Sequence, residues 1–109
     1  MIKFIIDHSR EGDTTIHQIE CEEVFTSSWE LKPGEKRYRI LSKLFLDKNK
    51  QYPIYYSWAV HDSEALALNV AAGDIRRGME RDESKGGAKF EEQKLIDKVG
   101  AVVVKKMEK

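Results

Sequence analysis

Hydrophobic and polar residues alternate in two short runs near the start of the chain. Ile2, Phe4 and Ile6 share one face in the first run, and the second run contains Ile16 and Ile19. A period of two is typical of β-strands, and the intervening Arg-Glu-Gly-Asp sequence favours a turn. We therefore predict a first hairpin over residues 2–21. If its turn centres on Glu11-Gly12, Phe4 faces Ile19 and Lys3 faces Glu20. A helix opened by Thr15-x-x-Gln18 as a capping box is the alternative, and the turn and strand propensities favour the hairpin.

A second and stronger alternation spans residues 37–46 and 52–61, on either side of the polar loop 47–51. If Leu46 pairs with Tyr52, all even-numbered residues of both strands share one face. The large side chains on that face are Tyr38, Ile40, Leu44, Leu46, Tyr52, Ile54, Tyr56, Trp58 and Val60. We predict that this face is core, and that the odd-numbered face with its cations is solvated.

Helical spacing replaces alternation after residue 62. Asp62 and Ser63 are good N-caps, and apolar residues then recur every three or four positions to Met79, which predicts a helix over residues 63–80. Residues 81–87 read as a polar linker, and residues 88–99 as a second helix followed by Gly100. The β-branched run 101–104 predicts a last strand, although one continuous helix is an alternative. Residues 22–36 show no clear pattern, apart from a turn near Pro33-Gly34.

These elements predict an α+β fold in a single domain spanning residues 1–109. Two antiparallel hairpins and the C-terminal strand would form an antiparallel sheet of four to five strands, with two helices packed on one face. The chain of 109 residues, 40% of them hydrophobic, suffices for one such core.

Charge is balanced overall and uneven along the chain. The 19 basic and 19 acidic residues cancel, so a whole-molecule affinity for nucleic acid or anionic membranes is not implied. Residues 1–31 nevertheless carry a net charge of −5, and residues 32–50 carry +5. The single cysteine, Cys21, excludes an internal disulfide, and no apolar run resembles a signal peptide or membrane helix. We expect a cytoplasmic protein that does not bind membranes.

The odd-numbered face of the second hairpin is the first candidate site. Cations that pair with phosphates and rings that stack on bases are typical of nucleic-acid sites on sheets. The candidate residues for nucleic-acid binding are Arg37, Arg39, Lys43, Lys48, Lys50 and Tyr55. A solvated face whose cations prevent edge-to-edge aggregation is the competing interpretation.

A protein partner is the alternative function, in a protein–protein interaction or regulatory module such as an inhibitor. Trp29 is a natural interface anchor, and the acidic N-terminal hairpin offers Glu20, Glu22 and Glu23 to a basic partner. Trp29 could equally cap the core beneath a loop. The oligomeric state is left open.

Catalytic and metal-binding patterns are weak. The predicted register makes His8 and His17 diagonal neighbours on one face, but two ligands fall short of the four usual at zinc. Glutamates around Cys21 should raise the pKa of its thiol, and His61-Asp62 is explained by helix capping. No glycine-rich phosphate loop is present. We therefore predict a non-catalytic binding protein with no cofactor and no metal.

Overall fold

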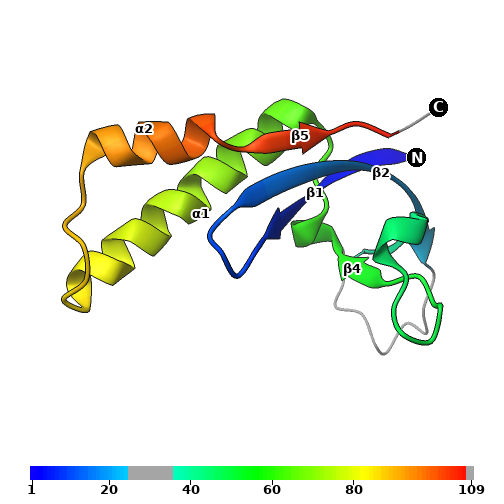
Figure 1. The fold of residues 1–109 in the computed structure, drawn as a ribbon. Helices are drawn as coiled ribbons and strands as arrows, with labels where there is room; N and C mark the ends of the chain where they lie inside the picture. Colours follow the sequence, from blue (N-terminus) through cyan, green and yellow to red (C-terminus); the bar gives the residue numbers. More distant parts are fainter. Residues whose placement is uncertain (25–35, 108–109) are drawn as a thin grey trace.

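The fold is described from a computed structural model, for residues 1–24 and 36–107 (Figure 1). The elements in chain order are β1 (Ile2–His8), β2 (Thr14–Val24), β3 (Arg37–Ile40), the short 3-10 helix η1 (Lys43–Phe45), β4 (Ile54–Tyr56), the short 3-10 helix η2 (Ser57–Ala59), α1 (Glu64–Ser84), α2 (Glu92–Gly100) and β5 (Val103–Lys105). The predicted α+β class is confirmed, as is a sheet of five strands with two helices.

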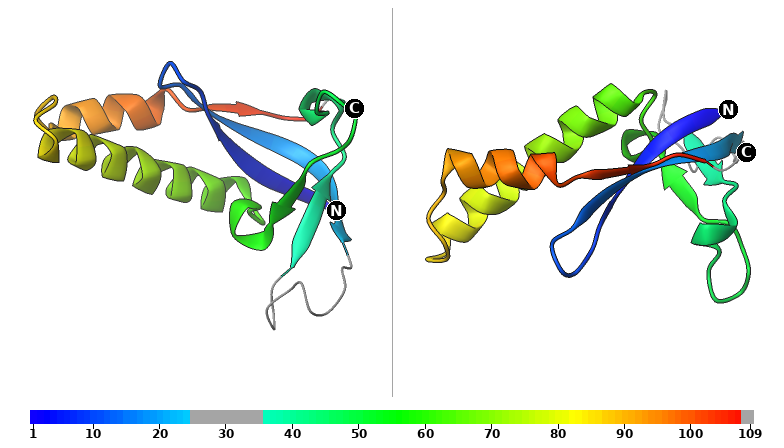
Figure 2. Two further views of the ribbon diagram at one scale, coloured as in Figure 1. Left: turned by 90° about the horizontal axis from the view of Figure 1, so that it is seen from below. Right: turned by 45° about the horizontal axis from the view of Figure 1, so that its top comes forward.

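The long strand β2 organises a curled sheet. Strands β1, β2, β3 and β4 follow one another as antiparallel neighbours, while β5 pairs with β2 in parallel. One edge of β2 is shared, because β5 pairs with residues 15–17 and β3 with residues 21–24. After β4 the chain returns to β1, where Phe4 and His61 exchange two backbone hydrogen bonds of 2.9 and 2.8 Å. The sheet therefore curls almost closed at this end, as the two views of Figure 2 show.

The first hairpin forms, but its predicted register is wrong by one residue. Lys3 lies opposite Ile19 and Phe4 opposite Gln18, because the loop contains the five residues 9–13. Within this loop the Ser9 hydroxyl accepts a hydrogen bond from the Asp13 amide at 3.0 Å, and Gly12 adopts a φ of 90°. Such a left-handed residue suits glycine and closes a turn with an odd number of residues.

The second hairpin is shorter than predicted, and its register is wrong. Arg37 pairs with Tyr56 and Arg39 with Ile54, so odd residues of β3 share a face with even residues of β4. Residues 41–53 leave the ladder, since they form η1 and a turn in which Asp47 accepts hydrogen bonds from two amides. The bulky residues that this shift exposes, contrary to prediction, are Leu44, Tyr52, Ile54, Tyr56 and Trp58.

Two hydrophobic clusters lie on the two faces of the sheet. The inner cluster, inside the curl, comprises Ile5, Ile19, Cys21, Tyr38, Ile40 and Val60, with Phe45 and Tyr55 packed against it. The outer cluster lies between the sheet and α1 and comprises Phe4, Ile16, Ala67 and Ala71, with Ile6, Leu68, Val102 and Val104 beside it. Tyr38, Ile40 and Val60 are thus buried as predicted.

Helix α1 begins where the sequence predicts and ends later. The Ser63 hydroxyl caps it by accepting a hydrogen bond from the Leu66 amide at 3.1 Å. The helix continues to Ser84, so the predicted linker at residues 81–87 is wrong over its first half. Gly78 disfavours a helix by only about 1 kcal/mol, and buried Met79 directly follows it. The helix ends before Gly86, which has a φ of 83°.

The C-terminal segment contains a helix and a strand rather than one continuous helix. Helix α2 begins at Glu92, four residues later than predicted, and packs against α1. The guanidinium of Arg76 contacts Glu92 at 3.1 Å and lies over the ring of Phe90, which fixes the chain before α2 to α1. The predicted last strand is confirmed as β5. No helix in the described part of the chain is long and apolar enough to cross a membrane.

Candidate binding surface

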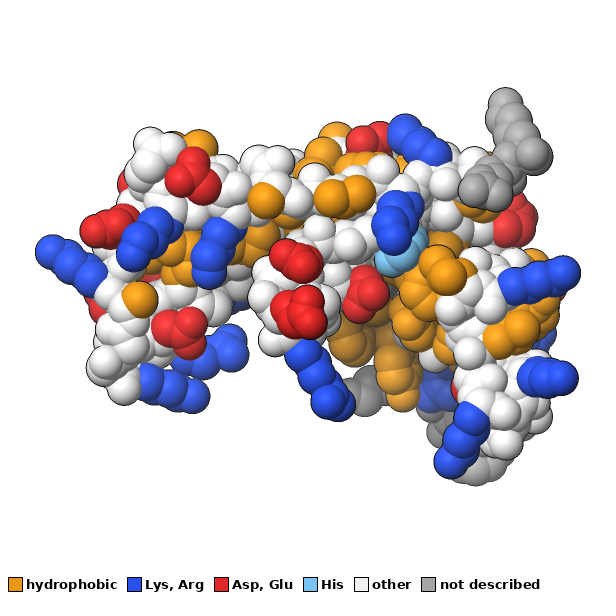
Figure 3. Space-filling model, viewed as in Figure 1, with side chains coloured by type: hydrophobic (Ala, Val, Ile, Leu, Met, Phe, Trp, Pro, Cys, Tyr) orange, Lys and Arg blue, Asp and Glu red, His pale blue; other side chains and the backbone are white. Residues whose placement is uncertain are grey.

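The outer face of the sheet is covered at one end and bare at the other. Helix α1 packs on β1 and β2, where Ile16 is fully buried. The pairing extends the same face through Glu22 and Arg39 to Ile54 in β4, which is 48% exposed. At the same end of the molecule, Figure 3 shows further hydrophobic side chains at the surface around η1. A bare apolar face beside a covered one is a candidate interaction surface.

An arginine and two aromatic rings form a stack on this bare face. The Arg37 guanidinium lies over the Tyr56 ring, 4.9 Å from its centroid. The Tyr56 ring in turn stacks on Trp58, with centroids 6.0 Å apart and an interplanar angle of 9°. Trp58 is 76% exposed. We call Arg37, Ile54, Tyr56 and Trp58 the aromatic platform.

The turn after β4 explains the exposure of Trp58. The Ser57 amide donates a hydrogen bond to the Lys36 carbonyl at 2.9 Å, which is the last contact of β4 with β3. The chain then enters η2, where the Val60 amide bonds back to Ser57 at 3.3 Å. Because a 3-10 turn breaks the alternation of a strand, Val60 enters the inner core while Trp58 remains outside.

Acidic residues of β2 neutralise part of the basic segment. Glu22 lies opposite Arg39 and forms an ion pair with it at 2.5 Å, and Glu23 contacts Lys36 at 4.0 Å. The acidic and basic stretches of the sequence therefore meet within one chain. Arg37 contacts the Tyr56 hydroxyl at 3.5 Å and forms no ion pair with the described residues. Arg37 is thus the main unneutralised charge of the platform.

The structure separates the residues predicted to bind nucleic acid. Arg37 and Arg39 lie on the outer face, whereas Lys43 belongs to η1 and lines a cavity beside β5. Lys48 and Lys50 are exposed in the turn before β4. Tyr55 packs against the inner core instead of standing beside the arginines, because of the register shift.

The structure also shows where three of the four residues predicted for a protein interface lie. Trp29 lies outside the described residues. Glu20 binds the N-terminal ammonium at 2.7 Å, and this contact raises the pKa of the amino group. Glu22 and Glu23 face the cations of β3 and Lys36 rather than solvent alone.

His8 and His17 are not neighbours on one face of the first hairpin, contrary to prediction. His8 lies opposite Thr14 and His17 opposite Ile5, which places the two imidazoles on opposite faces of the hairpin. Residues 1–24 and 36–107 contain no group of three or more His, Cys, Asp or Glu side chains arranged to hold a metal ion. Cys21 is buried, and burial more than the neighbouring glutamates raises the pKa of its thiol.

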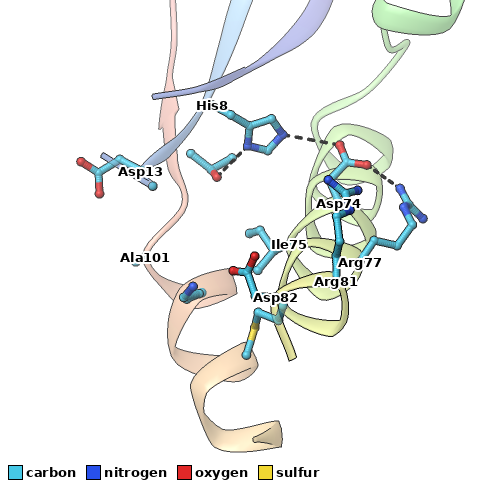
Figure 4. A pocket seen from close by; sticks show the side chains of 13 residues that line it. His8, Asp13, Asp74, Ile75, Arg77, Arg81, Asp82 and Ala101 are labelled. Carbon is cyan, nitrogen blue, oxygen red and sulfur yellow. Dashed lines mark hydrogen bonds and ion pairs between the residues drawn. The ribbon is translucent and has the colours of Figure 1, made fainter. Parts of the chain in front are cut away.

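A polar cavity of about 570 Å³ lies between the tip of the first hairpin and the two helices (Figure 4). His8 links the hairpin to α1, because its Nδ1 lies 3.0 Å from the Thr14 hydroxyl and its Nε2 lies 3.5 Å from Asp74. Asp74 also pairs with Arg77. This chain of contacts explains how the hairpin tip is held. The cations and carboxylates lining the cavity balance each other, so it has no preference for one sign of charge.

Sequence reasoning identified Arg37 but placed Tyr56 and Trp58 in the core. One signal could have corrected this. Pro53 has no amide hydrogen and is tolerated mainly at the start of a strand. A strand that begins only after Pro53 excludes the predicted pairing of Leu46 with Tyr52, and with it the register that placed Tyr56 and Trp58 in the core.

In comparisons with family models, with curated proteins and with solved structures, no match to this chain was found, so its function has to be inferred from its own residues.

Proposed function

We propose that the protein is a non-catalytic binding protein that binds single-stranded nucleic acid through its aromatic platform. The observation that carries this proposal is the parallel stack of Tyr56 and Trp58, with Trp58 76% exposed. Exposed aromatic rings beside cations are the usual stacking sites for unpaired bases.

The geometry of the stack favours a flat ligand. Arg37, Tyr56 and Trp58 already form successive layers, and the interplanar angle of 9° makes the indole of Trp58 nearly parallel to the Tyr56 ring. A base laid on Trp58 would extend the stack by one layer. Arg37 would meet a neighbouring phosphate, since its guanidinium is not neutralised by a described carboxylate.

The charges predict weak and only moderately salt-dependent binding. Glu22 and Glu23 neutralise two nearby cations, which leaves Arg37 with Lys48 and Lys50 to meet phosphates. Three contacts on a single strand correspond to a slope of log K against log salt of about −2. A strongly basic groove would give a much steeper slope.

Fluorescence anisotropy of labelled single-stranded and duplex DNA and RNA, titrated across salt concentrations, tests the proposal. Trp58→Ala should weaken single-strand binding by about 5- to 150-fold, because stacking on one aromatic contributes about 1–3 kcal/mol per base. Leu66→Ala is the matched control, since Leu66 is also exposed but lies on α1. Equal affinity of wild type and Trp58→Ala, or no binding at low salt, would refute the proposal.

A protein partner is the second candidate function, and the charge pairing favours it. With Arg39 and Lys36 neutralised, the bare face presents mainly Ile54, Tyr56, Trp58 and Arg37, a composition typical of interface hot spots. A photo-crosslinking amino acid at Ile54 tests this candidate in the native cells. A single crosslinked protein that disappears with Trp58→Ala would support it, and crosslinks unaffected by Trp58→Ala would contradict it.

A further inference from the structure

A second cavity opens where two neighbours of β2 diverge. Strand β5 pairs with β2 up to His17, and β3 pairs with it from Cys21 onward. Between these points the segment after β3 and the segment after β5 both turn away from β2. The Leu41 amide donates a hydrogen bond to the Glu20 carbonyl, and the Met107 amide donates one to the Gln18 side chain. The resulting cavity has a volume of about 620 Å³, within the usual range of small-molecule sites.

The walls of this cavity are largely apolar. They include Ile19, Leu41, Leu44, Phe45 and Met107. Phe45 meets the imidazole of His17 edge-on, with ring centroids 4.9 Å apart, so the floor is fixed by packing against the inner core. Leu44 is 70% exposed, because η1 turns its side chain out of the core. These side chains could contact the hydrocarbon part of a small ligand.

The rim of the cavity is positively charged. Lys43 contributes from η1, and Lys105 and Lys106 contribute from β5 and the residue after it. Lys106 pairs with Glu64 at 2.9 Å, and the one acidic residue of the lining, Glu20, pairs with the N-terminal ammonium. Lys43 and Lys105 form no ion pair with the described residues. The cavity therefore combines apolar walls with two ammonium groups that no carboxylate of the described residues neutralises.

We propose that this cavity binds a small amphipathic carboxylate, with its hydrocarbon body between Leu44 and Met107 and its carboxylate between Lys43 and Lys105. Charge complementarity selects an anion over a cation or a neutral molecule of the same shape. The site is independent of the aromatic platform, since Tyr56 lies on the outer face and the cavity opens beside η1 and β5.

Calorimetric titration of the full chain with decanoate, decylammonium and acetate tests the ligand class, with the two ten-carbon compounds kept below their micelle concentrations. Decanoate should bind saturably at one site. Decylammonium, which has the same chain and the opposite charge, should bind about tenfold more weakly or not at all, since one charged hydrogen bond contributes about 1.5–3 kcal/mol. Acetate lacks the hydrocarbon body and should not bind. Equal binding of decanoate and decylammonium, or no saturable decanoate binding, would overturn the proposal.

Variants locate the site. Lys43→Glu combined with Lys105→Glu should weaken decanoate binding at least about tenfold. Lys85→Glu with Lys89→Glu makes the same charge change at exposed positions outside the cavity and should leave decanoate binding unchanged. Leu44→Ser should weaken binding without unfolding the chain, because Leu44 is already exposed. Loss of decanoate binding in Trp58→Ala with no effect of the double lysine variant would place the ligand on the aromatic platform and refute this site.

Discussion

Ile16 and Ile54 are the same residue type on the same face of one sheet, and their surroundings differ completely. Ile16 in β2 is 0% exposed beneath α1, whereas Ile54 in β4 is 48% exposed. The helix reaches Ile16 because Ala67 and Ala71 present small side chains that permit close approach. Ile54 lies on β4, at the far end of the strand order from the two strands that α1 packs on. Alternation therefore assigns residues to a face, and the reach of the helix decides which part of that face is core.

The largest expected effect on stability comes from truncating each isoleucine in turn and comparing the two single variants. Ile16→Ala should lower the free energy of unfolding by about 2–5 kcal/mol, because it removes buried methyl groups and leaves a cavity under α1. Ile54→Ala should lower it by less than about 1 kcal/mol, since half of the side chain already contacts water. Urea denaturation of the two variants measures the difference. Similar losses would mean that something covers the bare end in solution, such as a second copy of the chain.

A pH titration sharpens the comparison, because the two buried histidines lie in the enclosed part of the molecule. Burial lowers the pKa of His17 and of His61 below the ordinary value of about 6.5. A lowered folded-state pKa means that the neutral imidazole is preferred in the native state. Stability should be complete above about pH 6.5 and should fall as the pH drops toward 5, by at most about 1.4 kcal/mol per pH unit for each group.

Urea denaturation at a series of pH values measures this slope. His17→Gln combined with His61→Gln should flatten the dependence between pH 7 and 5, whatever its effect on absolute stability. Asp62, whose pKa is lowered by its hydrogen bond and ion pair with Lys3, titrates in a more acidic range. An unchanged slope in the double variant would show that other groups control the acid response.

The contrast between the two hairpins shows how far the sequence predicts the fold. The strands, both helices and β5 follow from periodicity and capping, as at Ser63. Register does not, because it depends on how many residues the connection takes out of the ladder. The odd-numbered loop 9–13 shifted the first hairpin by one residue from its predicted register, and the excursion through η1 shifted the second by an odd number and reversed its faces.

The same reversal limited the prediction of the site. Arg37 follows from its position among cations, and it does lie on the outer face. Tyr55 and Tyr56 exchange roles, since the first packs against the core and the second joins the stack. The neutralisation of Arg39 by Glu22 depends on which residues of β2 and β3 face each other. Such a pairing between distant segments is fixed only by the tertiary fold.

The smallest expected effect on stability comes from Glu22→Gln at the bare end, and it separates the two functional candidates. The pair with Arg39 is about half exposed, so its loss should change the free energy of unfolding by less than about 1 kcal/mol. The variant leaves the Arg39 charge uncompensated beside the aromatic platform. Single-stranded nucleic acid should then bind more tightly at low salt, with a slope steeper by about 0.7 for one added phosphate contact. Glu80→Gln makes the same charge change on α1, next to Arg76, and should leave both affinity and slope unchanged. If Glu22→Gln changes neither the affinity for nucleic acid nor its salt slope, phosphates do not approach Arg39. The neutralised, aromatic face would then suit a protein partner better.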